Sequence, residues 1–285
     1  MPLLLSKERS WRWLSKPTLM GIVNLTTDSF SQDGFSENIP LAMAHAQKLV
    51  EEGAHWVDMG AQSTRPGAKL VDESIEKERI LTAVQVFRAQ NTKTFLSIDT
   101  MRASVAKEAL LAGADLINDV SGMLADVAML EVVASQKAAV CIGHMPGTPQ
   151  TMQNQLMEGD IVEKLLAFFS RRIEAAMAWG IARESILVDP CIGFGKSFEQ
   201  NWLLLRSLPR FRELNVRVAI GFSRKAFLGL LGNSAEPNSR DVATAAISAV
   251  LAAQSAVDLV RVHNVALAKT ALEAGTQLAS HSLPA

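Results

Sequence analysis

Three polar residues that could recognise a neutral heterocycle each end a short apolar run of the sequence. Asp99 follows TFLSI, Asn118 follows ADLI and Asp189 follows SILV. An ionised carboxylate accepts two parallel hydrogen bonds, which suits a ring with adjacent N–H donors. These residue types indicate a site for such a ring if the fold brings the three together.

A second set of residues could bind an anion. Arg65 lies in QSTRPG, Lys225 in GFSRKAF, and Arg261 and His263 in VRVHN. Arginine and lysine are common ligands of phosphate oxygens. A lone histidine at a strand end is often structural, but Arg261 and His263 are two residues apart on an expected strand and share a face. The two sets together suit a heterocycle that carries a diphosphate leaving group.

Eight short apolar runs end at or near a polar side chain, and helical stretches separate most of them. The polar residues are Asn24, Asp58, Asp99, Asn118, His144, Asp189, Ser223 and His263. Continuous apolar strands are typical of a parallel sheet covered by helices on both faces. We therefore predict a single α/β domain over 1–285, a (β/α)8 TIM barrel with its core at about 17–280. Its active site should lie at the C-terminal ends of the strands.

Local patterns support this arrangement. Apolar residues recur at helical spacing in 160–179 and 73–89, and Ser197 with Gln200 predicts a capping box. Glycines in EEGAHWVD and LAGADLIND mark expected helix ends. A doubly wound sheet is the competing architecture, but it would usually have a Gly-rich loop after the first strand. The chain has NLTTDSFSQDGF there, which favours the barrel.

Composition excludes several classes of protein. The chain has 285 residues, 48% hydrophobic and 20% charged, with a formal net charge of −1, so neither nucleic acid nor an acidic membrane is an expected partner. The N-terminal apolar run is too short for a signal segment, and no run of about 18 apolar residues predicts a membrane span. Cys141 and Cys191 are expected to be reduced thiols, and the expected location is cytoplasmic.

Three familiar site types do not fit the sequence. DPCIGFGKS has Pro190 where a Walker A loop needs its first glycine, and Lys196 there is as consistent with a surface residue as with a ligand contact. Ser223, His263 and Asp189 lack the G-x-S-x-G turn of a hydrolytic triad. Zinc-ligand spacings are absent as well.

The motifs in their order resemble those of the dihydropteroate synthase family. They are MGIVNLTTDSFSQDG, DMGAQSTRPGA, SIDT, GADLINDVSG, HMPGTPQTMQ, DPCIGFGKSFEQN, GFSRKAFLG and VDLVRVHNV, and they extend from about Leu19 to Ala271. The resemblance implies a pterin-binding barrel, usually homodimeric, which is a target of sulfonamides. It implies a transferase of folate biosynthesis that condenses 6-hydroxymethyl-7,8-dihydropterin diphosphate with 4-aminobenzoate and releases pyrophosphate.

The resemblance also implies roles for individual residues. Those that match the pterin pocket are Asp99, Asn118, Asp189 and Lys225. Those around the diphosphate are Asn24, Thr64, Arg65, Arg261 and His263, with Asn24 near an accompanying Mg2+. Those on the aminobenzoate side are Arg65, Pro66, Phe194 and Ser223. The implied path is SN1-like: pyrophosphate leaves, Asp99 and Asp189 hold the pterin methylene cation, and the amine attacks, with Lys225 and Arg261 also catalytic.

The chain departs from the usual family motifs in two loops. Thr27 and Gln32 change the loop after the first strand, and Ala61 and Gln62 change the loop after the second. These changes motivate one alternative, a paralogue that binds pterin but catalyses weakly. A second alternative is a pterin-dependent corrinoid methyltransferase, which should lack the S-T-R-P-G and S-R-K-x-F pair that this chain has.

Overall fold

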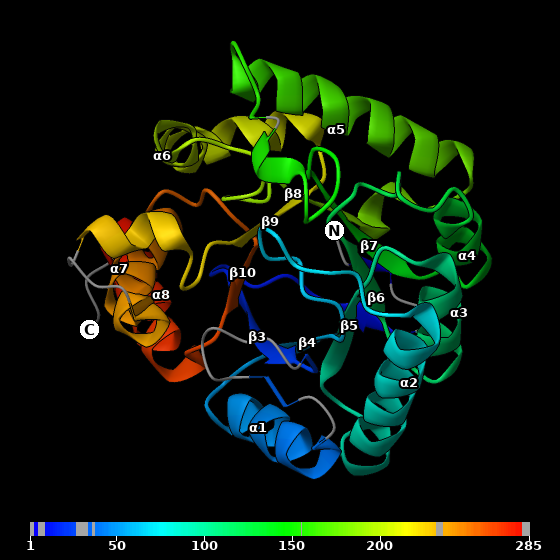
Figure 1. The fold of residues 1–285 in the computed structure, drawn as a ribbon. Coiled ribbons are helices and arrows are strands. Elements are labelled where there is room, and N and C mark those ends of the chain that lie inside the picture. Colours follow the sequence, from blue (N-terminus) through cyan, green and yellow to red (C-terminus); the bar gives the residue numbers. More distant parts are fainter. Residues whose placement is uncertain are drawn as a thin grey trace.

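Eight parallel strands close into a barrel in the order β10-β3-β4-β5-β6-β7-β8-β9, as predicted (Figure 1). The computed structural model describes residues 3–4, 9–26, 34–35, 38–154, 156–231 and 236–280. The barrel strands are β3 (Thr18–Asn24), β4 (Trp56–Gly60), β5 (Phe95–Asp99), β6 (Leu116–Asp119), β7 (Ala139–Gly143), β8 (Ile186–Asp189), β9 (Arg217–Gly221) and β10 (Leu259–Val262).

Helices form the outer layer and cover the barrel in Figure 1. The α-helices are α1 (Ile39–Glu51), α2 (Glu73–Gln90), α3 (Ala103–Leu111), α4 (Met129–Ser135), α5 (Ile161–Ala178), α6 (Phe198–Ser207), α7 (Asp241–Ala253) and α8 (Val265–Ala279). Short 3-10 helices are η1 (Met152–Asn154), η2 (Arg183–Ser185), η3 (Leu208–Leu214), η4 (Ala226–Leu231) and η5 (Pro237–Arg240).

The strand register brings the polar strand ends to one level. Asp99 pairs with Gly60 on one side and with Asn118 on the other, and Gly143 pairs with Asp189. Parallel neighbours in register have their carboxyl ends at the same edge of the barrel. Side chains that are far apart in the sequence therefore meet at this rim.

The two helices that the apolar spacing predicted are present. α5 begins at the cap residue Asp160, whose carboxylate accepts hydrogen bonds from the backbone of Val162 and Glu163. α2 is capped in the same way by Asp72. The apolar spacing in 160–179 also placed Met177 on the apolar face of this helix, and that was wrong, because Met177 near the end of α5 is 40% exposed.

The caps and turns between helices and strands also follow the prediction. Ser197 and Gln200 form the reciprocal capping box at the start of α6. Gly53 and Gly113, which follow α1 and α3, have φ angles of +110° and +115°. Only glycine adopts such angles without strain, so these positions let each helix turn directly into the next strand.

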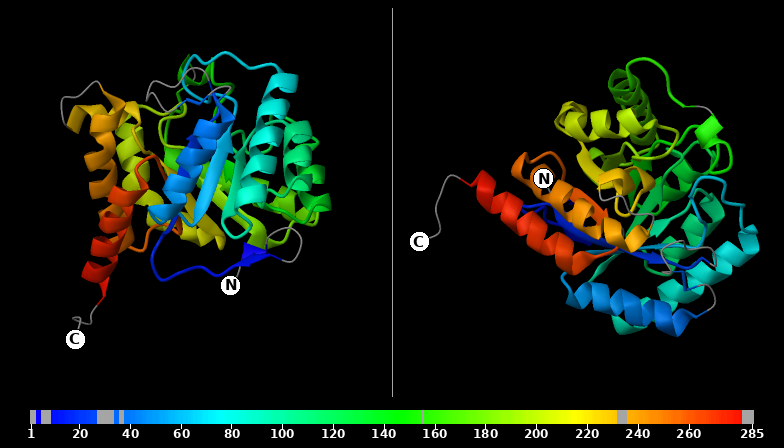
Figure 2. Two further views of the ribbon diagram at one scale, coloured as in Figure 1. Left: turned by 90° about the horizontal axis from the view of Figure 1, so that it is seen from below. Right: turned by 60° about the vertical axis from the view of Figure 1, so that its left-hand side comes forward.

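The N-terminal segment covers the end of the barrel opposite to the long loop after β4 (Figure 2, left). It includes a small antiparallel sheet, β1 (Leu3–Leu4) with β2 (Ser10–Trp11), which was not predicted. The Trp11 ring packs edge-on against Trp56 and Phe95, with ring centroids 6.0 and 5.1 Å apart. This segment therefore extends the apolar interior of the barrel at its base.

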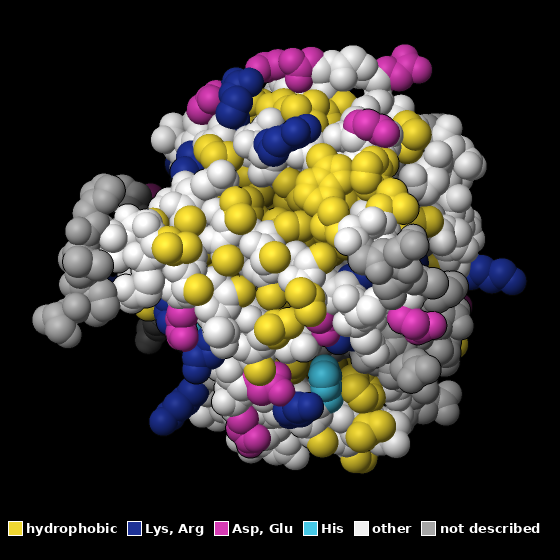
Figure 3. All heavy atoms as spheres, turned by 90° about the vertical axis from the view of Figure 1, so that its left-hand side faces the viewer, with side chains coloured by type: hydrophobic (Ala, Val, Ile, Leu, Met, Phe, Trp, Pro, Cys, Tyr) yellow, Lys and Arg dark blue, Asp and Glu magenta, His cyan; other side chains and the backbone are white. Residues whose placement is uncertain are grey.

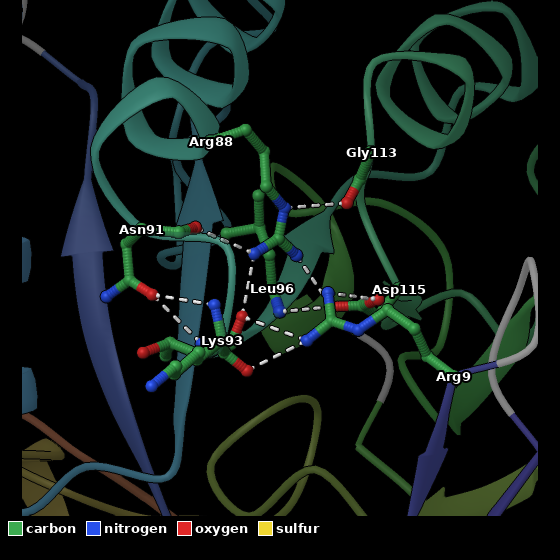
Figure 4. Close-up of polar contacts among 8 residues, drawn as sticks. Arg9, Arg88, Asn91, Lys93, Leu96, Gly113 and Asp115 are labelled. Carbon is green, nitrogen blue, oxygen red and sulfur yellow. Dashed lines mark hydrogen bonds and ion pairs between the residues drawn. The ribbon is translucent and has the colours of Figure 1, made fainter.

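Asp115 connects the N-terminal segment to two strands at this base (Figure 4). Its carboxylate forms ion pairs with Arg9 at 2.9 Å and Arg88 at 2.6 Å, and it accepts a hydrogen bond from the Leu96 backbone at 2.8 Å. Arg88 also donates to the carbonyl of Gly113. The network joins the segment, α2 and the starts of β5 and β6.

Within the described residues, no helix has the length and apolar character that a membrane span requires. Cys141 and Cys191 are both buried, free thiols, as expected. Burial raises the pKa of both thiols, that of Cys191 to about 12, so they carry no charge near neutral pH.

Candidate functional site

A cavity of 780 Å³ opens at the C-terminal rim of the barrel. Most of the predicted site residues line it: Asn24, Thr64, Arg65, Pro66, Asp99, Phe194, Ser223, Lys225, Arg261 and His263. Asn118 and Asp189 are not among its lining residues; both are buried, Asp189 as the last residue of β8 and Asn118 one residue before the end of β6. The sequence prediction therefore named residues that the fold does assemble in one place.

Arg261 lies between two carboxylates on the floor of the cavity. Its Nε donates to Asp58 Oδ2, and its Nη2 donates to Asp99 Oδ2 at 3.1 Å. The sequence suggested that Asp99 and Arg261 belong to two separate sets, one for a neutral ring and one for an anion, and that separation is wrong at this point. One guanidinium compensates two buried carboxylates, and it is left partly exposed to the cavity.

Asp58 was expected at the rim, but it lies inside β4 and is fully buried. Its Oδ2 accepts hydrogen bonds from both Arg261 and Asn118, the latter at 3.4 Å. Side chains of alternate strand residues point into the barrel, so Asp58 is two residues below the strand end and faces inward. It orients the two residues above it and does not line the cavity itself.

Burial controls the charge of Asp99. Desolvation raises its pKa from 3.8 to about 7, with Arg261 opposing the shift and Asp58 adding to it. Asp99 therefore changes its protonation near neutral pH. A ligand with N–H donors would favour the ionised form, because a carboxylate accepts and does not donate.

Lys225 extends beneath an aromatic ring at the side of the cavity. Its ammonium lies 4.0 Å from the centroid of Phe194 and donates to the carbonyl of Ile192. Burial lowers its pKa to about 8, against the opposing charge of Asp189. The lysine is therefore mostly cationic at neutral pH and close to a carboxylate of the predicted ring-binding set.

Ser223 and His263, which follow β9 and β10, form a hydrogen-bonded pair. The Ser223 hydroxyl lies 3.0 Å from His263 Nδ1 and accepts a hydrogen bond from the His263 backbone. Burial first, and then the charges of Arg224 and Arg261, lower the pKa of His263 well below its usual range. A neutral imidazole with Nδ1 at Ser223 has one nitrogen left for a ligand.

The hydrolytic triad rejected from the sequence has no support in this geometry. The Asp189 carboxylate accepts a hydrogen bond from the Cys191 backbone at 2.7 Å, and the described contacts of His263 are with Ser223. The neighbouring Arg224 forms a two-point ion pair with Asp241, at 2.7 and 2.9 Å. That ion pair positions the start of α7, so Arg224 has a structural role.

Lys196 is a cavity residue whose role the sequence left open. It is 3% exposed, and its ammonium donates to the His144 carbonyl at 2.9 Å and lies 3.1 Å from His144 Nδ1. Burial lowers the pKa of Lys196 to about 7 and that of His144 to about 3. His144, expected at the rim, therefore holds this lysine and does not line the cavity.

Other cavity residues were missed. Gln153, from the loop after β7, donates to the carbonyl of Gly193 at 2.9 Å, and Phe227 and Leu230 of η4 supply apolar lining. The sequence offers no spacing signal for these residues. Their places depend on how distant loops fold over the rim.

The described residues contain no group of three or more His, Cys, Asp or Glu that could hold a metal ion. Asn24, at the end of β3, lines the cavity and carries an amide oxygen. Mg2+ commonly binds through few protein oxygens together with substrate phosphates and water. Asn24 could contribute at most one such oxygen.

Comparison with known proteins identifies the family. Residues 20–263 match the model of the pterin binding enzymes. A dihydropteroate synthase of Synechocystis sp. is 42% identical over 253 residues, which cover 89% of this chain and 87% of the relative. The chain belongs to the dihydropteroate synthase family. It is accordingly a transferase.

Solved structures of the family agree with this membership. A Yersinia pestis dihydropteroate synthase with a sulfonamide drug complex has a TM-score of 0.90 and 36% identity, covering 97% of this chain and 98% of that one. A Xanthomonas albilineans dihydropteroate synthase with 4-aminobenzoic acid has a TM-score of 0.83 and 40% identity, covering 90% and 91%. Of the four unusual family positions, Ala61 and Gln62 are described here, whereas Thr27 and Gln32 lie outside the described residues.

Proposed function

We propose that this chain condenses 6-hydroxymethyl-7,8-dihydropterin diphosphate with 4-aminobenzoate, giving 7,8-dihydropteroate and pyrophosphate. The observation that carries the proposal is the joining of Asp99 and Arg261 on the floor of a rim cavity, in a chain of the dihydropteroate synthase family. The carboxylate would accept hydrogen bonds from the pterin ring, and the guanidinium would bind the diphosphate.

The pterin ring would bind at the buried carboxylates. Asp99 and Asp189 accept hydrogen bonds from ring N–H groups, while Asn118 and Lys225 donate to ring acceptors. All four are buried or border the cavity, so these hydrogen bonds form away from water. In a site of low dielectric each bond discriminates more strongly between ligands.

The diphosphate would bind at the cationic residues of the cavity. Arg65 and Arg261 supply charge, and Thr64 and the free nitrogen of His263 supply hydrogen bonds. The C–O bond breaks, and pyrophosphate leaves with the electron pair. The positive charge that develops on the pterin methylene is stabilised by the carboxylates of Asp99 and Asp189.

The aminobenzoate would enter beside Phe194, Pro66 and Ser223, which line the same cavity. Its amine nitrogen attacks the methylene carbon and then loses one proton, which completes the new C–N bond. The Xanthomonas albilineans relative with 4-aminobenzoic acid supports this part of the proposal.

Asn24 would contact Mg2+ that accompanies the diphosphate. The ion would neutralise charge on the departing pyrophosphate. The amide oxygen at the rim and the absence of a metal-binding cluster among the described residues fit an ion carried by the substrate.

We also propose a homodimer and a cytoplasmic location. Exposed apolar side chains gather on the face that contains α6, α7 and η4 (Figure 3). They include Leu203, Leu230, Leu231, Val242 and Val250. An apolar face of this kind suits burial against a second copy, and sedimentation of the purified chain would show a mass twice that of the monomer.

Pyrophosphate release by the purified chain tests the proposed reaction. The complete mixture holds the pterin diphosphate, 4-aminobenzoate and Mg2+, and the control mixture holds the pterin alcohol without its diphosphate. We expect pyrophosphate only from the first. Pterin binding without turnover would instead indicate the weakly catalytic paralogue. A separate mixture of the chain with a methylated pterin and a corrinoid tests the methyltransferase, which methyl transfer there would indicate.

A further inference from the structure

Gln62 is buried at the start of the loop after β4 and is fully hydrogen-bonded to the two ends of that loop. Its Nε2 donates to the carbonyls of Ser63 at 2.8 Å and Lys69 at 3.1 Å, and its Oε1 accepts from the Val71 backbone at 2.6 Å. The orientation of the amide follows from its partners, because carbonyls only accept and a backbone N–H only donates.

Val71 is also held through its carbonyl group. Arg102, the N-cap residue of α3, donates to the Val71 carbonyl at 2.6 Å and forms an ion pair with Glu76 of α2. Glu76 is 1% exposed and also accepts a hydrogen bond from the Thr100 hydroxyl at 2.6 Å. Thr100 directly follows Asp99, so the loop end is connected to the strand that carries the floor carboxylate.

The segment enclosed by these contacts supplies part of the cavity wall. Ser63, Thr64, Arg65 and Pro66 line the cavity, and the Gly67 backbone donates to the carbonyl of Pro149 in the loop after β7 at 2.9 Å. Residues 61–72 contain no helix or strand. The contacts of Gln62 and Arg102 therefore help to fix the segment, together with the Gly67 contact.

We propose that Gln62 is a positioning residue that fixes the 63–66 segment for 4-aminobenzoate, acting with Arg102 through the backbone of Val71, which both contact. Gln62 also lines the cavity, but its side-chain amide is hydrogen-bonded to the backbone of its own loop, so its effect would reach the substrate through Arg65 and Pro66. In this arrangement both donated bonds need the amide, because a carboxylate keeps the bond to Val71 but has no proton for the two carbonyl oxygens. The inference rests on the proposed function for its substrate, and on geometry alone for the loop.

Two variants separate this role from a general loss of fold. Gln62→Glu keeps the shape and removes both donors, and Gln62→Met keeps the approximate length and removes all three hydrogen bonds. We expect each to raise the KM for 4-aminobenzoate by about tenfold or more, with a smaller change in the KM for the pterin diphosphate. Gln85→Glu, on the exposed face of α2, is the matched control and should leave both constants unchanged.

Hydrogen exchange of residues 62–71 tests the loop independently of any activity. The Val71 amide should exchange at least tenfold faster in Gln62→Met than in the parent chain, while the barrel strands keep their protection. Unchanged exchange would overturn the positioning role. Faster exchange with an unchanged KM for aminobenzoate would refute the link to substrate, whereas a parent chain without turnover would count against the proposed function only.

Discussion

At the scale of single residues, the central feature is a cluster of charges that a ligand can redistribute. Arg261 joins Asp58 and Asp99, and Lys225 lies close to Asp189. Each cation interacts with a buried carboxylate and also lines the cavity. Removal of a cation would therefore affect both the ligand and the charge balance of the floor.

Lys225→Ala and Arg261→Ala should each lower kcat/KM by tenfold or more. Each change removes a charged hydrogen-bond donor, worth about 1.5–3 kcal/mol. Steady-state pyrophosphate release measures the effect, and Lys107→Ala and Arg206→Ala on exposed helix faces serve as matched controls. Near-parental kinetics in both site variants would mean that neither cation contacts the substrate.

Asp99→Asn should weaken pterin binding and also change how stability depends on pH. The pKa of Asp99 is about 7 in the folded chain against 3.8 for an unperturbed carboxyl. Between these values the folded state holds the proton more tightly, so the free energy of unfolding falls as pH rises from about 4 to about 7. Urea unfolding across this range should show a smaller decrease for the Asn variant. An identical slope would place the titrating group elsewhere, and loss of cooperative unfolding would make Asp99 structural.

At the scale of elements, the sequence was informative about where strands end and less so about which way side chains point. Asp99 and Asp189 end their strands as predicted, because an apolar run followed by a polar residue marks that end. Asp58 was misplaced, because Trp-Val-Asp-Met-Gly continues as strand for two residues past it. Lys196 was left undecided, since its burial depends on His144 from another loop.

The capping box of α6 gives an element-scale prediction. Ser197→Ala should lower the free energy of unfolding by about 1 kcal/mol, because the Gln200 backbone loses its acceptor. Denaturant unfolding measures this change. Ser135→Ala, near the end of α4 and exposed, should have a smaller effect, and equal losses in the two variants would contradict the role of the cap.

At the scale of the whole molecule, the two ends of the barrel have different roles. The cavity lies at the C-terminal rim. The N-terminal segment closes the base, where its Trp11 packs on Trp56 and its Arg9 forms an ion pair with Asp115. The barrel could be predicted because its repeat extends along the chain. The base could not, because its contacts join residues such as Arg9 and Asp115 that have no periodic relation.

Asp115→Asn should destabilise the fold by about 3–5 kcal/mol, since it removes the charge that compensates two arginines at a buried site. Thermal unfolding would show a lower Tm. Both KM values should stay close to those of the parent at temperatures where the variant is folded. A selective rise in either KM would contradict the separation of base and rim.

The account as a whole depends on one reaction at this rim, and product stoichiometry tests it most directly. The purified chain would be incubated with the pterin diphosphate, 4-aminobenzoate and Mg2+, and both products would be quantified over time. We predict equal amounts of 7,8-dihydropteroate and pyrophosphate, with none of either in the absence of the diphosphate group. Binding of the pterin substrate with no dihydropteroate formed would contradict the account.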